Sequence, residues 1–261
     1  MGNDVHNWLG SVQLDVTSAA LRLQPRVVAI DGPAGSGKTT VGYAVAEEIR
    51  FLFFDTGAMY RAVTWAALSR EIDVYDEQAV SRLAEAIHID ILPPPDAHHN
   101  ARASVVLVDG EDVSDAIRRA EVDQTVSIVS AYARVRAALS QQQRRVGLSY
   151  GSGEGERPGI VMVGRDIGTV IMPDAPVKIY LDASAEERAR RRYREILAKG
   201  EAADYDRVLA DIRRRDALDS GRALSPLRVA DDARIIDTST STIDAVVARV
   251  IDEIMRVAAQ L

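Results

Sequence analysis

Short apolar runs alternate along the chain with longer stretches in which apolar residues recur at helical spacing. The runs are VVAI (27–30), FLFF (51–54), IVMVG (160–164), VKIYL (177–181) and RIID (234–237). Because they are continuous rather than alternating, they indicate parallel strands covered on both faces. Helical patterns lie near residues 38–49, 58–70, 121–146, 185–199, 204–219 and 242–258. This order predicts an α/β fold with a doubly wound parallel sheet.

Residues 86–118 interrupt this alternation. HIDIL and ASVVLVDGEDVS read as short strands on either side of PPPD, and Asp109-Gly110 is typical of a hairpin turn. We therefore expect one domain over residues 26–261, with a small β-rich lobe inserted at about 86–118. The polar, glycine-rich segment 149–159 predicts a surface loop. Residues 1–25 carry no chemical motif and are expected to be an N-terminal extension, either disordered or loosely docked.

Composition limits the classes of function. Of the 261 residues 47% are apolar and none is cysteine, so disulfides and thiolate metal sites are excluded. No run reaches the ~18 apolar residues of a membrane span, and the start MGNDVHNWLG does not resemble a secretory signal. A net charge of −7 argues against a general nucleic-acid or lipid-surface binder. We expect a cytoplasmic monomer that binds small molecules, not nucleic acid or membranes.

The segment GPAGSGKTT follows the first apolar run and opens a helical pattern. It matches G-x-x-x-x-G-K-[ST], in which glycines let backbone N–H groups surround phosphate oxygens at a helix N-terminus. Lys38 is expected to reach the outer phosphates of a nucleotide, and the Thr39 hydroxyl to bind magnesium. The loop alone does not separate a kinase from a GTPase, a motor or a transport ATPase. The candidate nucleotide-binding residues are Gly32, Pro33, Ala34, Gly35, Ser36, Gly37, Lys38, Thr39 and Thr40.

Two further strand ends carry polar motifs, which indicates a second substrate. DTGAMYR follows the second run, with Thr56 placed to cap the next helix and Arg61 within it. GRDIGT ends the third run and exposes Arg165 and Asp166. Ligands gather at the carboxyl ends of parallel strands, and an arginine can hold a phosphate in bidentate fashion. A helix cap with a solvated arginine remains the alternative interpretation of the first motif.

An arginine-rich helix follows the fourth run. Helical geometry places Arg188, Arg191 and Arg192 on one face, and Glu186 and Glu187 predict that part of the helix is self-paired. We expect a mobile lid over residues 184–204 that closes on the triphosphate.

A second polar cluster follows the lid. Arg215, Asp219 and Arg222 share one side of the next helix and its exit. They form either a surface ladder or a clamp on a phosphorylated sugar.

Several motifs together resemble those of bacterial cytidylate kinases, over about residues 27–254. They are GPAGSGKTT, DTGAMYR, GEDVS with AIR, GRDIGTV, PDAPVKIYLDAS, RRRD and SPLRVADDARIIDTS. The resemblance implies a P-loop fold of the nucleoside monophosphate kinase type. It also implies transfer of the γ-phosphoryl group of ATP to CMP or dCMP with Mg2+, and an inserted lobe that shapes the pyrimidine pocket.

The resemblance also implies roles for individual residues. Thr56 and Arg61 would touch the acceptor phosphate or neighbouring atoms, and Arg165 would hold that phosphate. Ser127, Arg136 and Asp166 would line the cytosine. Asp219 would contact the sugar, with Arg215 and Arg222 near the sugar or phosphate. The catalytic candidates are Lys38, Arg165, Arg188 and Arg192.

One position departs from the family pattern, and it leaves alternatives open. The family usually has Glu or Asp just before GRD, where this chain has Val163. Asp31, beside the loop, is one candidate for the missing acid. The alternative functions are a related small-molecule kinase with another acceptor, such as AMP, UMP or shikimate, and a nucleotide-binding switch without turnover.

The expected chemistry needs no general base. The acceptor phosphate is already anionic at neutral pH, so alignment and charge neutralisation carry the reaction. An ionised Asp166 would accept from the 4-amino group of cytosine, whereas it would face the carbonyl oxygen of uracil. Asp166 is therefore the predicted determinant of the preference for CMP over UMP.

Overall fold

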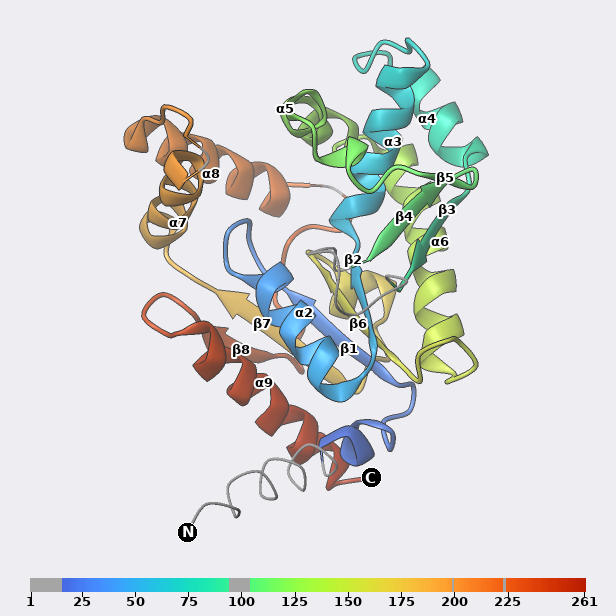
Figure 1. Cartoon of the computed structure of the whole chain (residues 1–261), viewed down its shortest axis with the longest axis vertical. Helices are drawn as coiled ribbons and strands as arrows, with labels where there is room; N and C mark the ends of the chain where they lie inside the picture. Colours follow the sequence, from blue (N-terminus) through green and yellow to red (C-terminus); the bar gives the residue numbers. More distant parts are fainter. Residues whose placement is uncertain (1–15, 94–103, 199, 223) are drawn as a thin grey trace.

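A five-stranded parallel sheet forms the centre of the computed structural model, which describes residues 16–93, 104–198, 200–222 and 224–261 (Figure 1). The spatial order is β2 (Leu52–Asp55), β6 (Ile160–Gly164), β1 (Val27–Asp31), β7 (Val177–Asp182) and β8 (Arg234–Asp237). All neighbouring pairs are parallel. The five predicted strands and the doubly wound sheet are thus confirmed.

Alternate residues of the strands pack into two separate hydrophobic cores, one on each face of the sheet. Val28 and Ile30 of β1 pack with α2 (Lys38–Ile49) and α9 (Ile243–Ala258). Val27 and Ala29 pack on the opposite face, in a core that includes α3 (Gly57–Ser69), α6 (Ala133–Gly151) and the inserted lobe. Burial on both faces is why these strands lack an alternating pattern.

The inserted lobe holds a three-stranded antiparallel sheet in the order β3 (Ile89–Leu92), β4 (Val105–Val108) and β5 (Glu111–Asp112). The predicted turn joins β4 to β5, with positive φ at Asp109 (50°) and Gly110 (87°). The PPPD segment lies mostly in residues 94–103, outside the described part. β3 and β4 share the second core with α3, so the lobe is packed onto the main sheet domain.

The prediction of one continuous helix over residues 121–146 is wrong. The chain forms α5 (Ala120–Val129) and α6, separated by an extended Tyr132 whose hydroxyl donates to the carbonyl oxygen of Val74. The sequence has no glycine or proline at this break. The contact with Val74, which is distant in the chain, fixes the break instead. The sequence analysis also missed α4 (Glu77–Ala86), whose first turn is capped by the carboxylate of Asp76.

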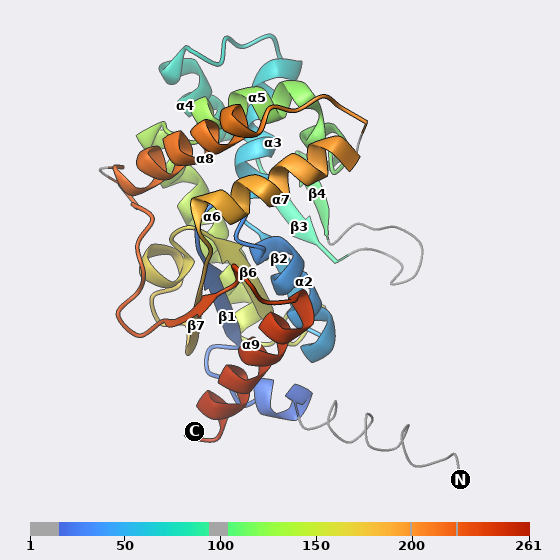
Figure 2. The same cartoon turned by 90° about the vertical axis from the view of Figure 1, so that its left-hand side faces the viewer.

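Two helices cover the end of the sheet where the strands finish. α7 (Ala185–Ala198) and α8 (Tyr205–Ser220) run side by side above the phosphate-binding loop, and α8 begins at a capping Asp204 (Figure 2). At the other end of the domain, residues 16–20 are helical, and Val16, Ala20 and Leu23 are buried in the first core. No helix in the described ranges is long and apolar enough to cross a bilayer.

Candidate active site

The phosphate-binding loop joins β1 to α2, as the motif requires. Gly32 adopts φ 147°, and a Cβ there would lie 2.1 Å from the carbonyl oxygen of Leu181, so only glycine fits. Gly37 adopts φ 91° and stands at the N-cap of α2, which leaves the N-terminus of that helix without a side-chain cap. Uncapped N–H groups at a helix N-terminus favour an anion. The loop therefore has the geometry of a phosphate site.

Lys38 lies folded into this loop. Its Nζ donates to the carbonyl oxygen of Pro33 at 2.6 Å and to Ser36 Oγ at 3.4 Å. Burial lowers the pKa of Lys38 well below its usual value, and the positive charge of Arg165 lowers it further, while Asp55 and Asp31 act in the opposite direction. A bound phosphate would stabilise the charged ammonium form.

The end of β2 supports the loop through Asp55. The Asp55 Oδ2 accepts from the Thr39 hydroxyl at 3.2 Å, and Oδ1 accepts from the backbone N–H of Gly57 at 2.9 Å. Thr56 is the N-cap residue of α3, but its side chain makes no cap hydrogen bond, so the predicted capping role is wrong. Its buried hydroxyl donates instead to the carbonyl oxygen of Val163 at 2.9 Å, which joins β2 to β6.

An ion-pair cluster lies beyond the end of β6. The Nε of Arg165 donates to Asp219 Oδ2 at 3.0 Å, and Arg222 pairs with Oδ1 of the same carboxylate. Burial raises the pKa of Asp219, but the adjacent charges of Arg165 and Arg222 outweigh burial and hold it below its usual value. Asp219 therefore stays ionised and fixes both guanidinium groups.

A cavity of about 230 Å³ adjoins this cluster. Four residues predicted from sequence line it: Ser127, Arg215, Asp219 and Arg222. They come from α5, from α8 and from the exit of α8, so the fold brings together segments almost 100 residues apart in the chain. Arg61 of α3 forms an ion pair with Asp123 of α5. Its positive charge is also one of the causes that lower the pKa of Arg215, after burial and the charge of Arg165.

A second buried pair lies next to the same elements. Arg136 donates to Asp166 Oδ2 at 2.8 Å, and the Arg136 guanidinium lies 5.4 Å from the ring centre of Tyr60. Arg136 is 4% exposed, and its Nε has no hydrogen-bond partner among the described residues. A buried N–H donor without a partner is rare in a folded protein. This guanidinium is therefore suited to a ligand acceptor.

The three arginines assigned to one face of α7 have different surroundings. Arg188 is buried and bonds to Ala34 of the loop at 3.1 Å and, through both terminal nitrogens, to Asp216 of α8. Arg191 donates to Thr238, whose hydroxyl in turn donates to the carbonyl oxygen of Ser36. Arg192 instead pairs with Glu195 on the surface. The structure thus brings Arg188 and Arg191 to the loop, but not Arg192.

Comparisons with known proteins show the family of this chain. The family model described as cytidylate kinase matches residues 28–256. The chain belongs to the cytidylate kinase family. The cytidylate kinase of Bacillus licheniformis is 44% identical over 224 residues, which are 86% of this chain and 93% of that protein. The cytidylate kinase of Roseiflexus castenholzii is 46% identical over 231 residues, covering 87% and 94%, and that of Bacillus subtilis is 42% identical over 227 residues, covering 87% and 95%.

Position 163, where the resemblance to cytidylate kinases led us to expect an acid, is apolar and buried. Val163 is 1% exposed and lies beneath α2, where a Cβ on Gly42 would come within 2.5 Å of its Cγ1. Asp31 is the last residue of β1, and its position in the strand places it on the opposite face of the sheet from Val163. Its carboxylate accepts from the backbone N–H groups of Ile167 and Gly168 at 2.9 and 2.8 Å. Burial raises the pKa of Asp31 to about 6, although these two hydrogen bonds lower it.

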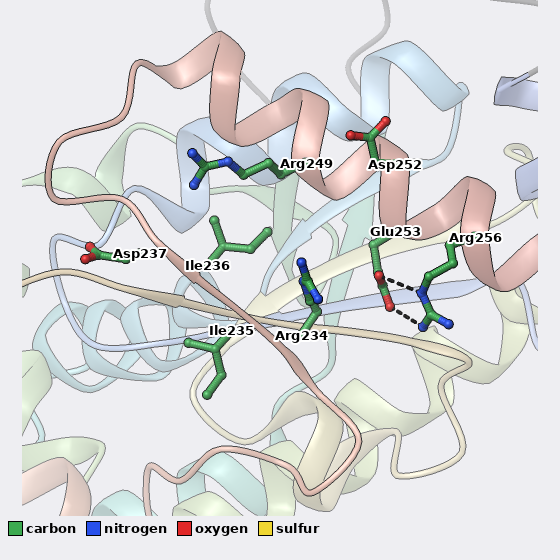
Figure 3. A pocket seen from close by; sticks show the side chains of 8 residues that line it. All are labelled: Arg234, Ile235, Ile236, Asp237, Arg249, Asp252, Glu253 and Arg256. Carbon is green, nitrogen blue, oxygen red and sulfur yellow. Dashed lines mark hydrogen bonds and ion pairs between the residues drawn. The ribbon is translucent and has the colours of Figure 1, made fainter.

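A second cavity, of about 350 Å³, lies away from these residues, at the free edge of the sheet. It is formed between β8 and α9, where Arg256 pairs with Glu253 (Figure 3). None of the site residues predicted from the sequence lines this cavity.

Asp55 and Asp216 were not predicted from the sequence as site residues. Asp55 opens the DTGAMYR motif, which was a usable signal, whereas only the folded contact with Arg188 reveals Asp216.

Proposed function

We propose that this protein transfers the γ-phosphoryl group of ATP to CMP or dCMP, yielding ADP and CDP or dCDP. The buried Arg136–Asp166 pair carries the choice of acceptor. Cytosine presents a donor, its 4-amino group, beside acceptors at N3 and O2. An ionised carboxylate only accepts and a guanidinium only donates, so the pair complements that edge. Uracil presents a carbonyl oxygen in place of the amino group and would face the carboxylate without a donor.

The cationic residues supply the rest of the proposed mechanism. Lys38 and the N-terminus of α2 would hold the outer phosphates of ATP, while Arg165, Arg222 and Arg215 would hold the acceptor phosphate. Because that phosphate is ionised at neutral pH, it attacks without a general base, and catalysis consists of in-line alignment and charge neutralisation. Asp219 keeps Arg165 and Arg222 in place before the acceptor binds.

The loop also fits a magnesium ion. The exposed hydroxyl of Thr39 lies beside a carboxylate, and hydroxyl and carboxylate oxygens are suitable ligands for Mg2+. Within the described ranges no three or more His, Cys, Asp or Glu residues are grouped closely enough to form a metal cage of their own. This matches an ion bound jointly by the protein and the nucleotide phosphates, where it neutralises developing charge.

The direct test is ADP release with ATP as donor and each nucleoside monophosphate as acceptor. We expect turnover with CMP and dCMP and at least about fivefold lower kcat/KM with UMP, the smaller end of the penalty for a mismatched buried polar group. Preferred turnover with AMP, UMP or shikimate would contradict the assignment. Neither alternative suggested by the sequence is favoured, because the relatives from Bacillus licheniformis, Roseiflexus castenholzii and Bacillus subtilis are all named cytidylate kinases. The cytoplasmic location and the monomeric state stay predictions from the sequence.

A further inference from the structure

The chain lacks the acidic residue that its family usually carries at position 163, next to the phosphate-binding loop. Val163 is the last residue but one of β6, the neighbour of β1, and its side chain is enclosed by α2 and the adjacent strands. A valine cannot accept a hydrogen bond or bind a cation. If the metal-bound nucleotide is to meet a carboxylate here, another strand end must provide it.

Asp31 does not meet this requirement. Both of its carboxylate oxygens accept backbone N–H groups from the turn Ile167–Ile171, at 2.9 and 2.8 Å, and the side chain is buried. These bonds hold the segment that follows Arg165 and Asp166. Moving the carboxylate towards a metal would leave the N–H groups of Ile167 and Gly168 without acceptors, which is unfavourable for buried donors.

Asp55 meets it. It is the register partner of Val163 in the β2–β6 pairing, so it ends the next strand at the same level of the sheet. Its Oδ1 is fixed by the N–H of Gly57, and its Oδ2 accepts the proton of the Thr39 hydroxyl at 3.2 Å. A hydroxyl that donates its proton to a carboxylate keeps its oxygen lone pairs available for a cation. The carboxylate also places a negative charge directly beside that oxygen.

We propose that Asp55, at the end of β2, replaces the missing acid at position 163 and, together with Thr39, positions the magnesium ion of the bound nucleotide. This inference rests on the proposed function, since it concerns the metal that accompanies ATP. It depends on two features found together in this chain, the valine at 163 and the Thr39–Asp55 hydrogen bond. Asp55 acts through Thr39 and through its charge, so it is a positioning residue.

The test measures metal binding without turnover. ADP binding to the full-length protein is titrated calorimetrically in EDTA and in Mg2+, and Mn2+ bound to the protein–ADP complex is measured by electron paramagnetic resonance. We expect Asp55→Asn to weaken Mn2+ binding about 10- to 100-fold, as loss of an outer partner of a metal ligand typically does. Metal-free ADP binding should stay within about threefold, because no phosphate contact is lost.

Asp182→Asn is the matched control. Asp182 ends β7 and accepts from the N–H of Ala183 at 2.9 Å, whereas the Thr39 hydroxyl donates to Asp55, so Mn2+ binding should be unchanged in this variant. Thr39→Val completes a double-mutant cycle, in which the two substitutions together should cost no more than the larger single effect. If Asp55→Asn does not fold, Asp55→Ser keeps an oxygen that can accept from Gly57 and replaces it in the cycle.

The proposal is overturned if Asp55→Asn retains the Mn2+ affinity of the wild type, or if its effect adds fully to that of Thr39→Val. Failure of the proposed function gives a different result. In that case the wild type itself would bind no ADP or would form none in the presence of ATP and CMP.

Discussion

The substitution Asp166→Asn separates base recognition from the remaining binding energy. Asparagine has nearly the same shape as aspartate, but its amide can donate as well as accept. The carboxylate of Asp166 favours a donor on the base, whereas the amide can rotate to serve cytosine or uracil. We therefore expect the ratio of kcat/KM for CMP to that for UMP to fall by about 1–3 kcal/mol, roughly 5- to 150-fold.

The same substitution weakens the fold by an amount that the structure bounds. Arg136 is 4% exposed, and Asp166 is its acidic partner at 2.8 Å. Removing one charge of a buried pair typically costs about 3–5 kcal/mol, and the contact of Arg136 with the Tyr60 ring offsets only part of that loss. Because domains are stable by about 5–15 kcal/mol, the variant should stay folded at 25 °C, but with a lower urea midpoint.

Asp219→Asn is the matched control for the specificity ratio. It makes the same chemical change in a buried carboxylate that holds Arg165 and Arg222, at the end of the site assigned to sugar and phosphate. Both acceptors share these groups, so Asp219→Asn should lower kcat/KM for CMP and for UMP by similar factors. An unchanged ratio in Asp166→Asn, measured on protein shown to be folded, would refute the role of the carboxylate in base selection.

Three further predictions concern the loop and its supports. Burial raises the pKa of Asp31 to about 6 from an ordinary 3.8, so this group contributes stability below pH 4 that is lost as the pH rises through 6. The free energy of unfolding should fall by about 3 kcal/mol over this range through Asp31 alone, and Asp31→Asn should lack this part of the fall; identical pH slopes in urea titrations would contradict it. Arg188→Ala removes contacts to Ala34 and Asp216 and should lower kcat/KM for ATP at least about tenfold, whereas the exposed Arg190→Ala should not, and equal effects in steady-state assays would count against an anchoring role. Gly42→Ala places a methyl group 2.5 Å from Val163 Cγ1 and should cost about 1–3 kcal/mol in denaturant titrations, a loss that Val163→Ala should partly reverse.

The sequence predicted the features that depend on local pattern. The five strands are continuous apolar runs because both of their faces are covered. The loop motif contains Gly32 and Gly37 at positions where the backbone adopts positive φ. Even β8 was found, although Arg234 and Ile235 are exposed at the free edge of the sheet. The Asp109-Gly110 turn was likewise marked by residues that tolerate positive φ.

Features that depend on distant contacts were not predictable in the same way. The break before α6 is fixed by the hydrogen bond from Tyr132 to Val74, 58 residues away, and no local breaker marks it. Helical spacing correctly placed Arg188 and Arg191 on one face, but only the packing of α7 against α8 shows that Arg188 meets Asp216. Threonine is a residue type that often caps helices, yet the Thr56 hydroxyl donates to the carbonyl oxygen of Val163 in the neighbouring strand. In each case a tertiary partner outweighed a local preference.

The distribution of charge links the two candidate substrate sites. Arg165 bonds to Asp219 in the acceptor cluster, and its charge also lowers the pKa of Lys38 in the phosphate-binding loop. Arg215, from the wall of the acceptor cavity, acts on Lys38 in the same direction. Cations from both sites therefore repel one another across the ends of β1 and β6. A phosphate bound in either site is attracted by these cations, and the charge of Arg165 acts on both sites at once. Arg165 is therefore placed to offset the repulsion between the two phosphates that in-line transfer brings together.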